Sequence, residues 1–123
     1  MKLRFRKNSL RLRINQRELE TLAKGSALEE HVHFPGGAML TYILESAPGS
    51  APGARLEGGT IRISAPSHEI AQWAGSDEVG LYFELSANSG NLKVAIEKDL
   101  VCIDGPEEER DPEAFPRMER STC

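Results

Sequence analysis

Hydrophobic and polar residues alternate at the start of the chain. Every second residue is apolar in residues 2–6 and again in residues 10–14, and the residues between them are basic. A period of two is typical of strands that bury one face. Lys7 and Asn8 lie between the two segments, and Asn tolerates the positive φ of a tight turn. The pattern therefore predicts that the chain opens with a β-hairpin.

A short helix is predicted to follow this hairpin. Asn15 and Glu18 have the spacing of a capping box, in which each side chain binds the backbone N–H of the other residue. The apolar residues of segment 19–23 lie at positions i, i+3 and i+4, which gives the helix one apolar stripe. Gly25 is a typical helix stop. We expect about ten helical residues.

Two further strands, 28–34 and 39–45, are expected after the helix, with a turn at Pro35–Gly37 between them. Residues 47–53 contain only small residues, proline and glycine. This composition is typical of a flexible connector. The connector separates the chain into two halves.

The pattern of the first half recurs in the second. A shift of 51 positions aligns residues 8–25 with residues 59–76 without a gap, and the apolar stripe of the helix keeps its phase. Residues 79–85 match the third strand, and with one residue of slippage residues 92–96 match the fourth. We therefore expect two copies of a ββαββ unit, about 1–46 and 54–100, joined by the linker 47–53 and related by duplication.

The predicted fold class is α+β. Two pseudo-symmetric units with two short helices are expected to form a small antiparallel or mixed β-barrel, or a strongly curved sheet, with the helices over its open ends. A chain of 123 residues suits one domain, which we place at residues 1–104. Trp73 shares the phase of the second apolar stripe and is expected in the core.

Charge is distributed unevenly along the chain. The net charge is −4, yet seven of the 15 basic residues precede the first acid, Glu18. From Asp104 to Glu119 there are seven acids, two arginines and three prolines. Such a stretch buries too little apolar surface to offset its ordering entropy. Residues 105–123 are therefore predicted to be an acidic tail, loose or lying over the surface.

The basic residues of the opening hairpin are the first candidate site. A two-residue turn after Arg6 pairs Arg4 with Arg11 and Lys2 with Arg13, so like charges face each other and an anionic neighbour is expected. That neighbour is either an anionic ligand such as phosphate, which guanidinium groups bind bidentately, or the acids of adjacent strands and the tail. The candidate ligand-binding residues are Arg4, Arg11, Arg13 and Arg62.

The function expected from these residues is that of a non-enzymatic binding domain for an anionic ligand or an acidic protein partner. Nucleic acid is a less favoured partner, because the chain is acidic overall and no aromatic residues are interleaved with the arginines. No Gly-x-Ser-x-Gly elbow or phosphate-loop motif indicates catalysis, and no catalytic residue is assigned. The chain is expected to be a monomer or a homodimer.

A metal site is the alternative. His31 and His33 lie two residues apart and hence on one face of a strand, and Cys102, Asp104 or His68 could supply a third ligand. No Cys-x-x-Cys or His-Glu-x-x-His spacing accompanies them, so a surface pair of histidines is the simpler interpretation. We expect no metal and no other cofactor.

The chain start shows no secretory signal, and no segment has the roughly 20 apolar residues of a membrane span. A cytoplasmic location without a membrane partner is therefore expected.

Three segments carry a resemblance to a known family: the opening MKLRFRKNSLRLRI, residues 28–34 (LEEHVHF) and residues 97–104 (EKDLVCID). Together they resemble a family of small bacterial proteins of unknown function, over the chain to about residue 104. This resemblance implies a bacterial source and no particular activity, cofactor or site. Residues 59–99 are also similar to swapped-hairpin DNA-binding regulators, which work as interleaved dimers. DNA-binding regulation is therefore a further alternative.

Overall fold

The structure is a computed structural model that describes residues 1–49, 51–100 and 113–115. The expectations for Cys102, Asp104 and most of the tail lie outside these residues. The elements, in chain order, are β1 (Lys2–Arg6), β2 (Ser9–Ile14), α1 (Gln16–Ala23), β3 (Leu28–His33), the 3₁₀ turn η1 (Pro35–Gly37), β4 (Met39–Ala47), β5 (Gly53–Glu57), β6 (Thr60–Pro66), α2 (Ser67–Ala74), β7 (Gly80–Ala87) and β8 (Gly90–Lys98).

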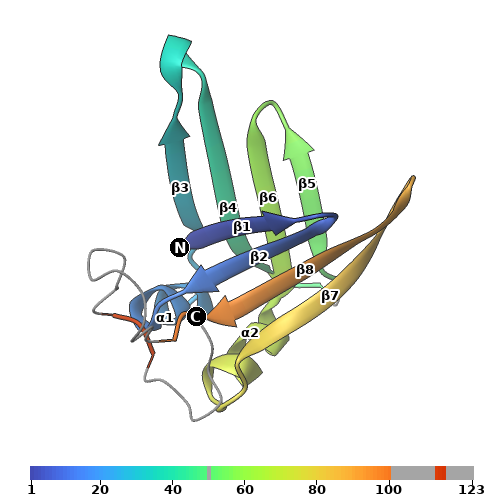
Figure 1. The fold of residues 1–123 in the computed structure, drawn as a ribbon. Helices are drawn as coiled ribbons and strands as arrows, with labels where there is room; N and C mark the ends of the chain where they lie inside the picture. Colours follow the sequence, from blue (N-terminus) through green and yellow to red (C-terminus); the bar gives the residue numbers. More distant parts are fainter. Residues whose placement is uncertain (50, 101–112, 116–123) are drawn as a thin grey trace.

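The strands form two four-stranded sheets, in the orders β1-β2-β8-β7 and β3-β4-β6-β5 (Figure 1). Each sheet combines one hairpin from each half of the chain. The hairpins meet in a parallel ladder, β2 with β8 in one sheet and β4 with β6 in the other, and all other neighbouring strands are antiparallel. The α+β class is confirmed, and most of the described chain is strand.

The expected barrel is wrong. Each helix carries the chain from one sheet to the other, so the eight strands divide into two sets of four instead of forming one sheet. Four strands are too few to close around a packed interior, for which about eight are usual. Each sheet therefore keeps two edge strands: β1 and β7 in one, β3 and β5 in the other.

Local sequence signals explain the first half of the fold. The Asn15 side chain accepts from the Glu18 backbone N–H at 2.9 Å, and the Glu18 carboxylate accepts from the Asn15 N–H at 3.0 Å, which completes the predicted capping box. Gly25, with φ of 95°, follows the end of α1. In the opening hairpin, Lys7 and not Asn8 has the positive φ, which is 52°. The Asn8 amide instead donates to the Asn91 carbonyl and ties this turn to the β7-β8 turn.

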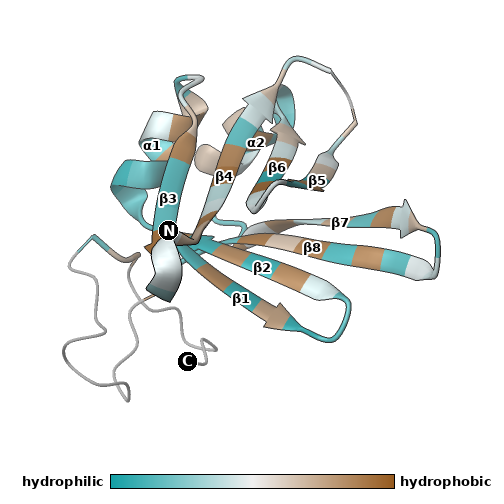
Figure 2. Cartoon of the chain, turned by 90° about the horizontal axis from the view of Figure 1, so that it is seen from above, coloured by the Kyte–Doolittle hydropathy of each residue, from teal (hydrophilic) through white to brown (hydrophobic). Residues whose placement is uncertain are grey.

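The apolar faces of both sheets and both helices share one core. The helices lie together at one end of the molecule, next to both sheets (Figure 1). Figure 2 shows the alternation of apolar and polar residues along β1, β2 and β8, which sends one set of side chains inward and the other outward. Trp73 is fully buried, as predicted, and its indole N–H donates to the Glu78 carbonyl at 3.0 Å. The core consists of Leu10, Leu12, Ile14, Leu19, Leu22, Leu28, Leu44, Ile63, Ala65, Ile70, Trp73, Val94 and Ile96.

Neither helix in the described part of the chain has the length and apolar character needed to cross a membrane.

Candidate anion-binding site

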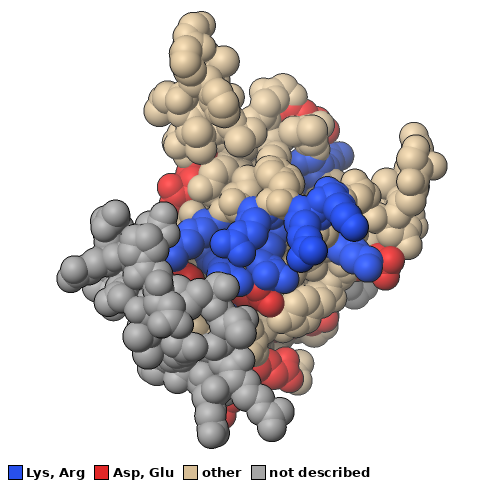
Figure 3. Space-filling view, viewed as in Figure 1, with Lys and Arg blue, Asp and Glu red and all other residues tan. Residues whose placement is uncertain are grey.

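The outer face of sheet β1-β2-β8-β7 carries a concentration of basic side chains. Because Leu10, Leu12 and Ile14 point into the core, the residues between them point outward. A continuous band of Lys and Arg crosses this side of the molecule (Figure 3). We call it the basic face. Its residues are Lys2, Arg4 and Arg6 on β1, Ser9, Arg11 and Arg13 on β2, Lys93, Ala95 and Glu97 on β8, and Gly80, Tyr82 and Glu84 on β7.

The strand registers arrange these twelve residues in three rows across the sheet. The rows are Lys2-Arg13-Glu97-Gly80, Arg4-Arg11-Ala95-Tyr82 and Arg6-Ser9-Lys93-Glu84. Neighbouring strands are about 4.8 Å apart and successive rows about 6.7 Å apart in any sheet of this kind. The basic face is therefore a regular grid, in which long side chains from neighbouring positions can meet over a short one.

Lys2, Arg11 and Arg13 pair with acids of the chain itself. Lys2 Nζ lies 2.7 Å from Oδ2 of Asp99, a buried residue just after β8. Glu97 Oε1 lies 3.1 Å from Arg11 Nε and 3.8 Å from Arg13 Nε. The expected pairing with a strand acid therefore occurs for Arg11 and Arg13, whereas Lys2 pairs with an acid that follows the strand.

Glu97 also fixes Tyr82. The Tyr82 hydroxyl donates to Glu97 Oε2 at 2.7 Å. Burial, together with this hydrogen bond to a carboxylate, raises the pKa of Tyr82 to about 12. Gly80 leaves the space that Glu97 needs, since a Cβ at position 80 would lie 2.9 Å from Glu97 Cγ and 2.5 Å from the Ile96 carbonyl oxygen.

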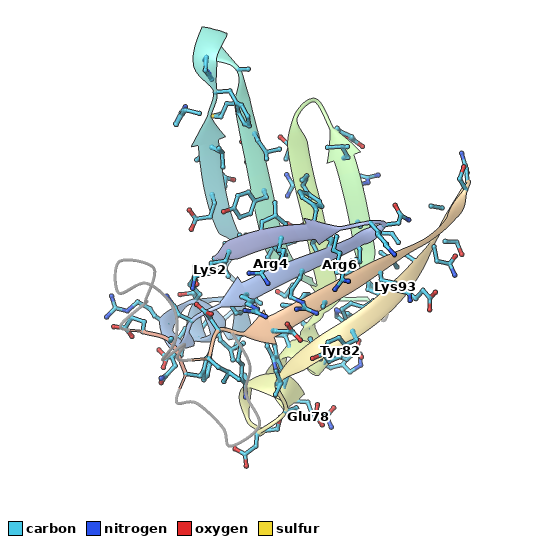
Figure 4. The ribbon with its side chains drawn as sticks, viewed as in Figure 1. Lys2, Arg4, Arg6, Glu78, Tyr82 and Lys93 are labelled. Atoms are coloured by element: carbon cyan, nitrogen blue, oxygen red, sulfur yellow. The ribbon has the colours of Figure 1, made fainter. Side chains whose placement is uncertain are left out.

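Three cations of the basic face have no such neutralisation. Within the residues that the structure describes, Arg4, Arg6 and Lys93 form no ion pair. Glu84 is the register neighbour of Lys93, but its carboxylate accepts from the Asn91 amide at 3.1 Å. Figure 4 shows Arg4 and Arg6 along β1, with Lys93 and Tyr82 across the sheet from them. The free positive charge is thus confined to one part of the face.

A groove with a volume of about 520 Å³ lies at these three cations. Its lining includes the short side chains of Ser9 and Ala95, the four cations Arg4, Arg6, Arg11 and Lys93, the Tyr82 ring and one acid, Glu84. This volume lies within the range of small-molecule sites, about 300–1,000 Å³. The arrangement can hold a small anion beside Arg4, Arg6 and Lys93, which have no ion-pair partner among the described residues.

A family model matches residues 1–119, and the family it describes is one of unknown function, DUF7009. The chain belongs to DUF7009. The predicted resemblance to a family of unknown function is thereby confirmed. No curated protein and no solved structure matches the chain. The site of this DUF7009 chain must therefore be interpreted from its own residues.

The structure brings together three of the four predicted ligand-binding residues. Arg4, Arg11 and Arg13 share the basic face, whereas Arg62 lies on β6 in the other sheet and donates to Glu45 Oε2 at 3.0 Å. Sequence reasoning placed Arg6 in the basic hairpin but not among the ligand-binding candidates, and it missed Lys93 and Tyr82. The parallel β2-β8 ladder brings these two residues to the site, and no local pattern in the sequence encodes that pairing.

The histidine pair lies elsewhere, on β3. His31 Nε2 is 2.9 Å from Glu29 Oε2, and His31 Nδ1 is 3.0 Å from the Thr41 hydroxyl. Among the described residues, no group of three or more His, Cys, Asp and Glu side chains is placed to hold a metal ion. The predicted third ligands Cys102 and Asp104 lie outside those residues.

Proposed function

We propose that this DUF7009 chain is a binding domain, rather than an enzyme, and that it holds a small phosphate-bearing anion in the groove of the basic face. The observation that carries the proposal is the contrast within one face. Lys2, Arg11 and Arg13 have carboxylate partners, whereas Arg4, Arg6 and Lys93 line a groove and have none in the described chain.

The arrangement costs free energy when the groove is empty. Arg4 lies directly opposite Arg11 in the β1-β2 ladder, and like charges in that position are destabilising by a few tenths of a kcal/mol or more. An anion between the two side chains removes this repulsion. Arginine is suited to the task, because its planar guanidinium binds two oxygens of a phosphate at once.

The acids at the margins of the face favour a small ligand over a long one. Glu97 lies in the first row and Glu84 in the third, on the side of β7 and β8. A long polyanion that crossed the sheet would meet both carboxylates. A ligand of a few phosphates at Arg4, Arg6 and Lys93 would lie near only Glu84, whose carboxylate accepts from the Asn91 amide. A DNA duplex also needs phosphate contacts over a wider basic surface than this groove supplies.

The test of this proposal is to titrate the protein with inorganic tripolyphosphate and to measure binding by isothermal titration calorimetry. The double variant Arg4→Ala/Arg6→Ala is expected to bind at least about tenfold more weakly than the wild type, since each hydrogen bond to a charged group contributes about 1.5–3 kcal/mol. The affinity of the wild type is expected to fall as salt is raised.

The matched control is Arg55→Ala/Arg62→Ala. These two arginines face each other in the β5-β6 ladder as Arg4 and Arg11 do in β1-β2, and their removal changes the net charge by the same amount. The control is expected to bind like the wild type. Equal losses in the two double variants would contradict the proposal, because they would show that general charge, and not this groove, attracts the anion.

We also infer that the two halves of the chain arose by duplication. The registers of the two parallel ladders support this. In one ladder Ser9 pairs with Lys93, and in the other Thr60 pairs with Thr41. Thr60 is the position that corresponds to Ser9 by the shift of 51, and Lys93 is the position that corresponds to Thr41 by the shift of 52. The two ladders therefore pair equivalent positions of the two halves. The ion pair of Arg11 with Glu97 likewise corresponds to that of Arg62 with Glu45.

A further inference from the structure

Besides its charged residues, the groove contains a slot, which we define as the space above Ala95 between the side chains of Arg11 and Tyr82. In the middle row of the basic face, Ala95 lies between Arg11 on β2 and Tyr82 on β7. Two strand spacings, about 9.6 Å, separate the backbones of Arg11 and Tyr82, and only the Ala95 methyl group lies between them. The Tyr82 side chain is 60% exposed although it forms a wall of the groove. An aromatic surface is thus presented to solvent opposite a guanidinium group.

One carboxylate holds both walls of this slot. Glu97 accepts from the Tyr82 hydroxyl with Oε2, at 2.7 Å, and lies 3.1 Å from Arg11 Nε with Oε1. The two side chains are therefore positioned before any ligand arrives, which lowers the entropy cost of binding. The same carboxylate makes one end of the slot negative.

The opposite end of the slot has a net positive charge, because its row holds two cations, Arg6 and Lys93, and one acid, Glu84. The next row along the strands, about 6.7 Å away, places Arg6 and Lys93 on either side of Ser9, a short side chain whose hydroxyl donates to the Arg6 carbonyl. Arg4 lies beside Arg11 in the middle row. A ligand with a flat ring over Ala95 must therefore direct its anionic part away from Glu97 and toward Arg6 and Lys93.

We infer that the groove binds a nucleoside di- or triphosphate, with the base in the slot between Tyr82 and Arg11 and the phosphates at Arg4, Arg6 and Lys93. This inference rests on the proposed function and adds the class of ligand. Any nucleic-acid base can stack on a tyrosine ring or on a guanidinium plane. The three unpaired cations suit two or three phosphate groups.

A single nucleotide fits the face better than a nucleic-acid strand. Proteins that bind single strands present successive aromatic side chains, one for each of several bases. Tyr82 is the one aromatic residue among the twelve that make up the basic face. A strand that continued past the slot would also meet Glu97 or Glu84 instead of further cations.

The experiment compares ATP, inorganic tripolyphosphate and adenosine by calorimetry at one salt concentration, without added metal. ATP is expected to bind about tenfold more tightly than tripolyphosphate, because the stacking of one base contributes that much or more. Adenosine alone is expected to bind more weakly than either. Tyr82→Ala and, separately, Ala95→Leu are expected to remove most of the advantage of ATP over tripolyphosphate, because each lowers the affinity for ATP more than that for tripolyphosphate.

Tyr82→Phe is the conservative control. It keeps the ring and loses only the hydrogen bond to Glu97, so most of the preference for ATP should remain. Both positions point out of the core, and circular dichroism checks that each of the three variants is folded. If Tyr82→Phe loses the preference as completely as Tyr82→Ala, the ring does not stack on the base and the inference is wrong.

The outcomes separate the two proposals. Equal affinities of the wild type for ATP and tripolyphosphate would overturn the nucleotide inference and leave the anion site standing. Binding of neither compound would overturn both. Tighter binding of a mixed-sequence single-stranded oligonucleotide than of ATP, with the same loss in Tyr82→Ala, would replace the nucleotide with a nucleic-acid strand as the occupant.

Discussion

At the scale of single residues, Glu97 connects the internal ion pairs of the basic face with its proposed binding slot. It neutralises part of the charge of two arginines, and it also orients Tyr82. Arg4, which is the register neighbour of Arg11, receives none of this compensation in the described chain. Arg11 on β2 thus has a carboxylate partner, whereas Arg4 on the neighbouring strand β1 forms no ion pair within the described residues.

The titration of Tyr82 tests this arrangement. Its pKa in the folded chain is about 12, above the ordinary value of 10.0, so the neutral hydroxyl is the form that folding favours. The resulting stabilisation is complete below about pH 10 and is lost as the pH rises through about 12. In Glu97→Gln, the loss of the carboxylate is expected to move the Tyr82 pKa back toward its ordinary value. The ultraviolet absorption of tyrosinate measures this shift.

The second tyrosine is the internal reference for this titration. Burial has the largest effect on Tyr42 and raises its pKa, and the nearby carboxylates of Glu30 and Glu18 raise it further. Glu97 does not contribute to this shift. The titration of Tyr42 should be the same in the wild type and in Glu97→Gln. An unchanged Tyr82 titration in Glu97→Gln would mean that the hydrogen bond does not hold the hydroxyl in solution.

At the scale of the elements, local signals determine the hairpins and the helix ends. The capping box of Asn15 and Glu18 was readable because both partners lie within four residues of each other. The other helix, α2, begins after Pro66 with no side-chain cap. The fold therefore depends on a side-chain cap at one helix and not at the other.

Asn15→Ala should lower the free energy of unfolding by about 1 kcal/mol, the usual contribution of an N-cap side chain. Urea denaturation followed by Trp73 fluorescence measures it, since Trp73 is the only tryptophan and is fully buried. Ser67→Ala, at the first residue of α2, is the control and is expected to change stability much less, because Pro66 is the N-cap residue there. A cost below a few tenths of a kcal/mol for Asn15→Ala would show that α1 does not depend on its cap.

The sequence also limits what could be predicted at this scale. The alternation in β1 and β2 correctly predicted the Arg4-Arg11 pair, because a two-residue turn determines the register of a hairpin. It could not predict the β2-β8 ladder, whose partners lie more than 80 residues apart in the chain. Lys93 and Tyr82 were missed for that reason. The barrel was wrong for a related reason, because periodicity does not show which sheet a hairpin joins after a helix.

At the scale of the whole molecule, the two sheets have related registers and different outer faces. Arg55 and Arg62 occupy on β5 and β6 the positions that Arg4 and Arg11 occupy on β1 and β2. There, however, Glu45 lies 3.0 Å from Arg62 and Glu57 lies 3.9 Å from Arg55. Acids thus balance the arginines of one sheet, whereas the other sheet keeps free cations over a groove. In a chain with a net charge of −4, this local excess of cations is the basis of the proposed binding role.

The most direct test of that role maps the binding site on the labelled, full-length chain. In a ¹⁵N-¹H correlation spectrum, titration with tripolyphosphate is expected to shift the amide signals of β1, β2 and β8 around Arg4, Arg6 and Lys93. The signals of Arg55 and Arg62 in the other sheet should stay in place, and they provide the comparison within one molecule. Shifts of equal size on both sheets, or shifts confined to β5 and β6, would contradict the assignment of the basic face as the anion-binding site.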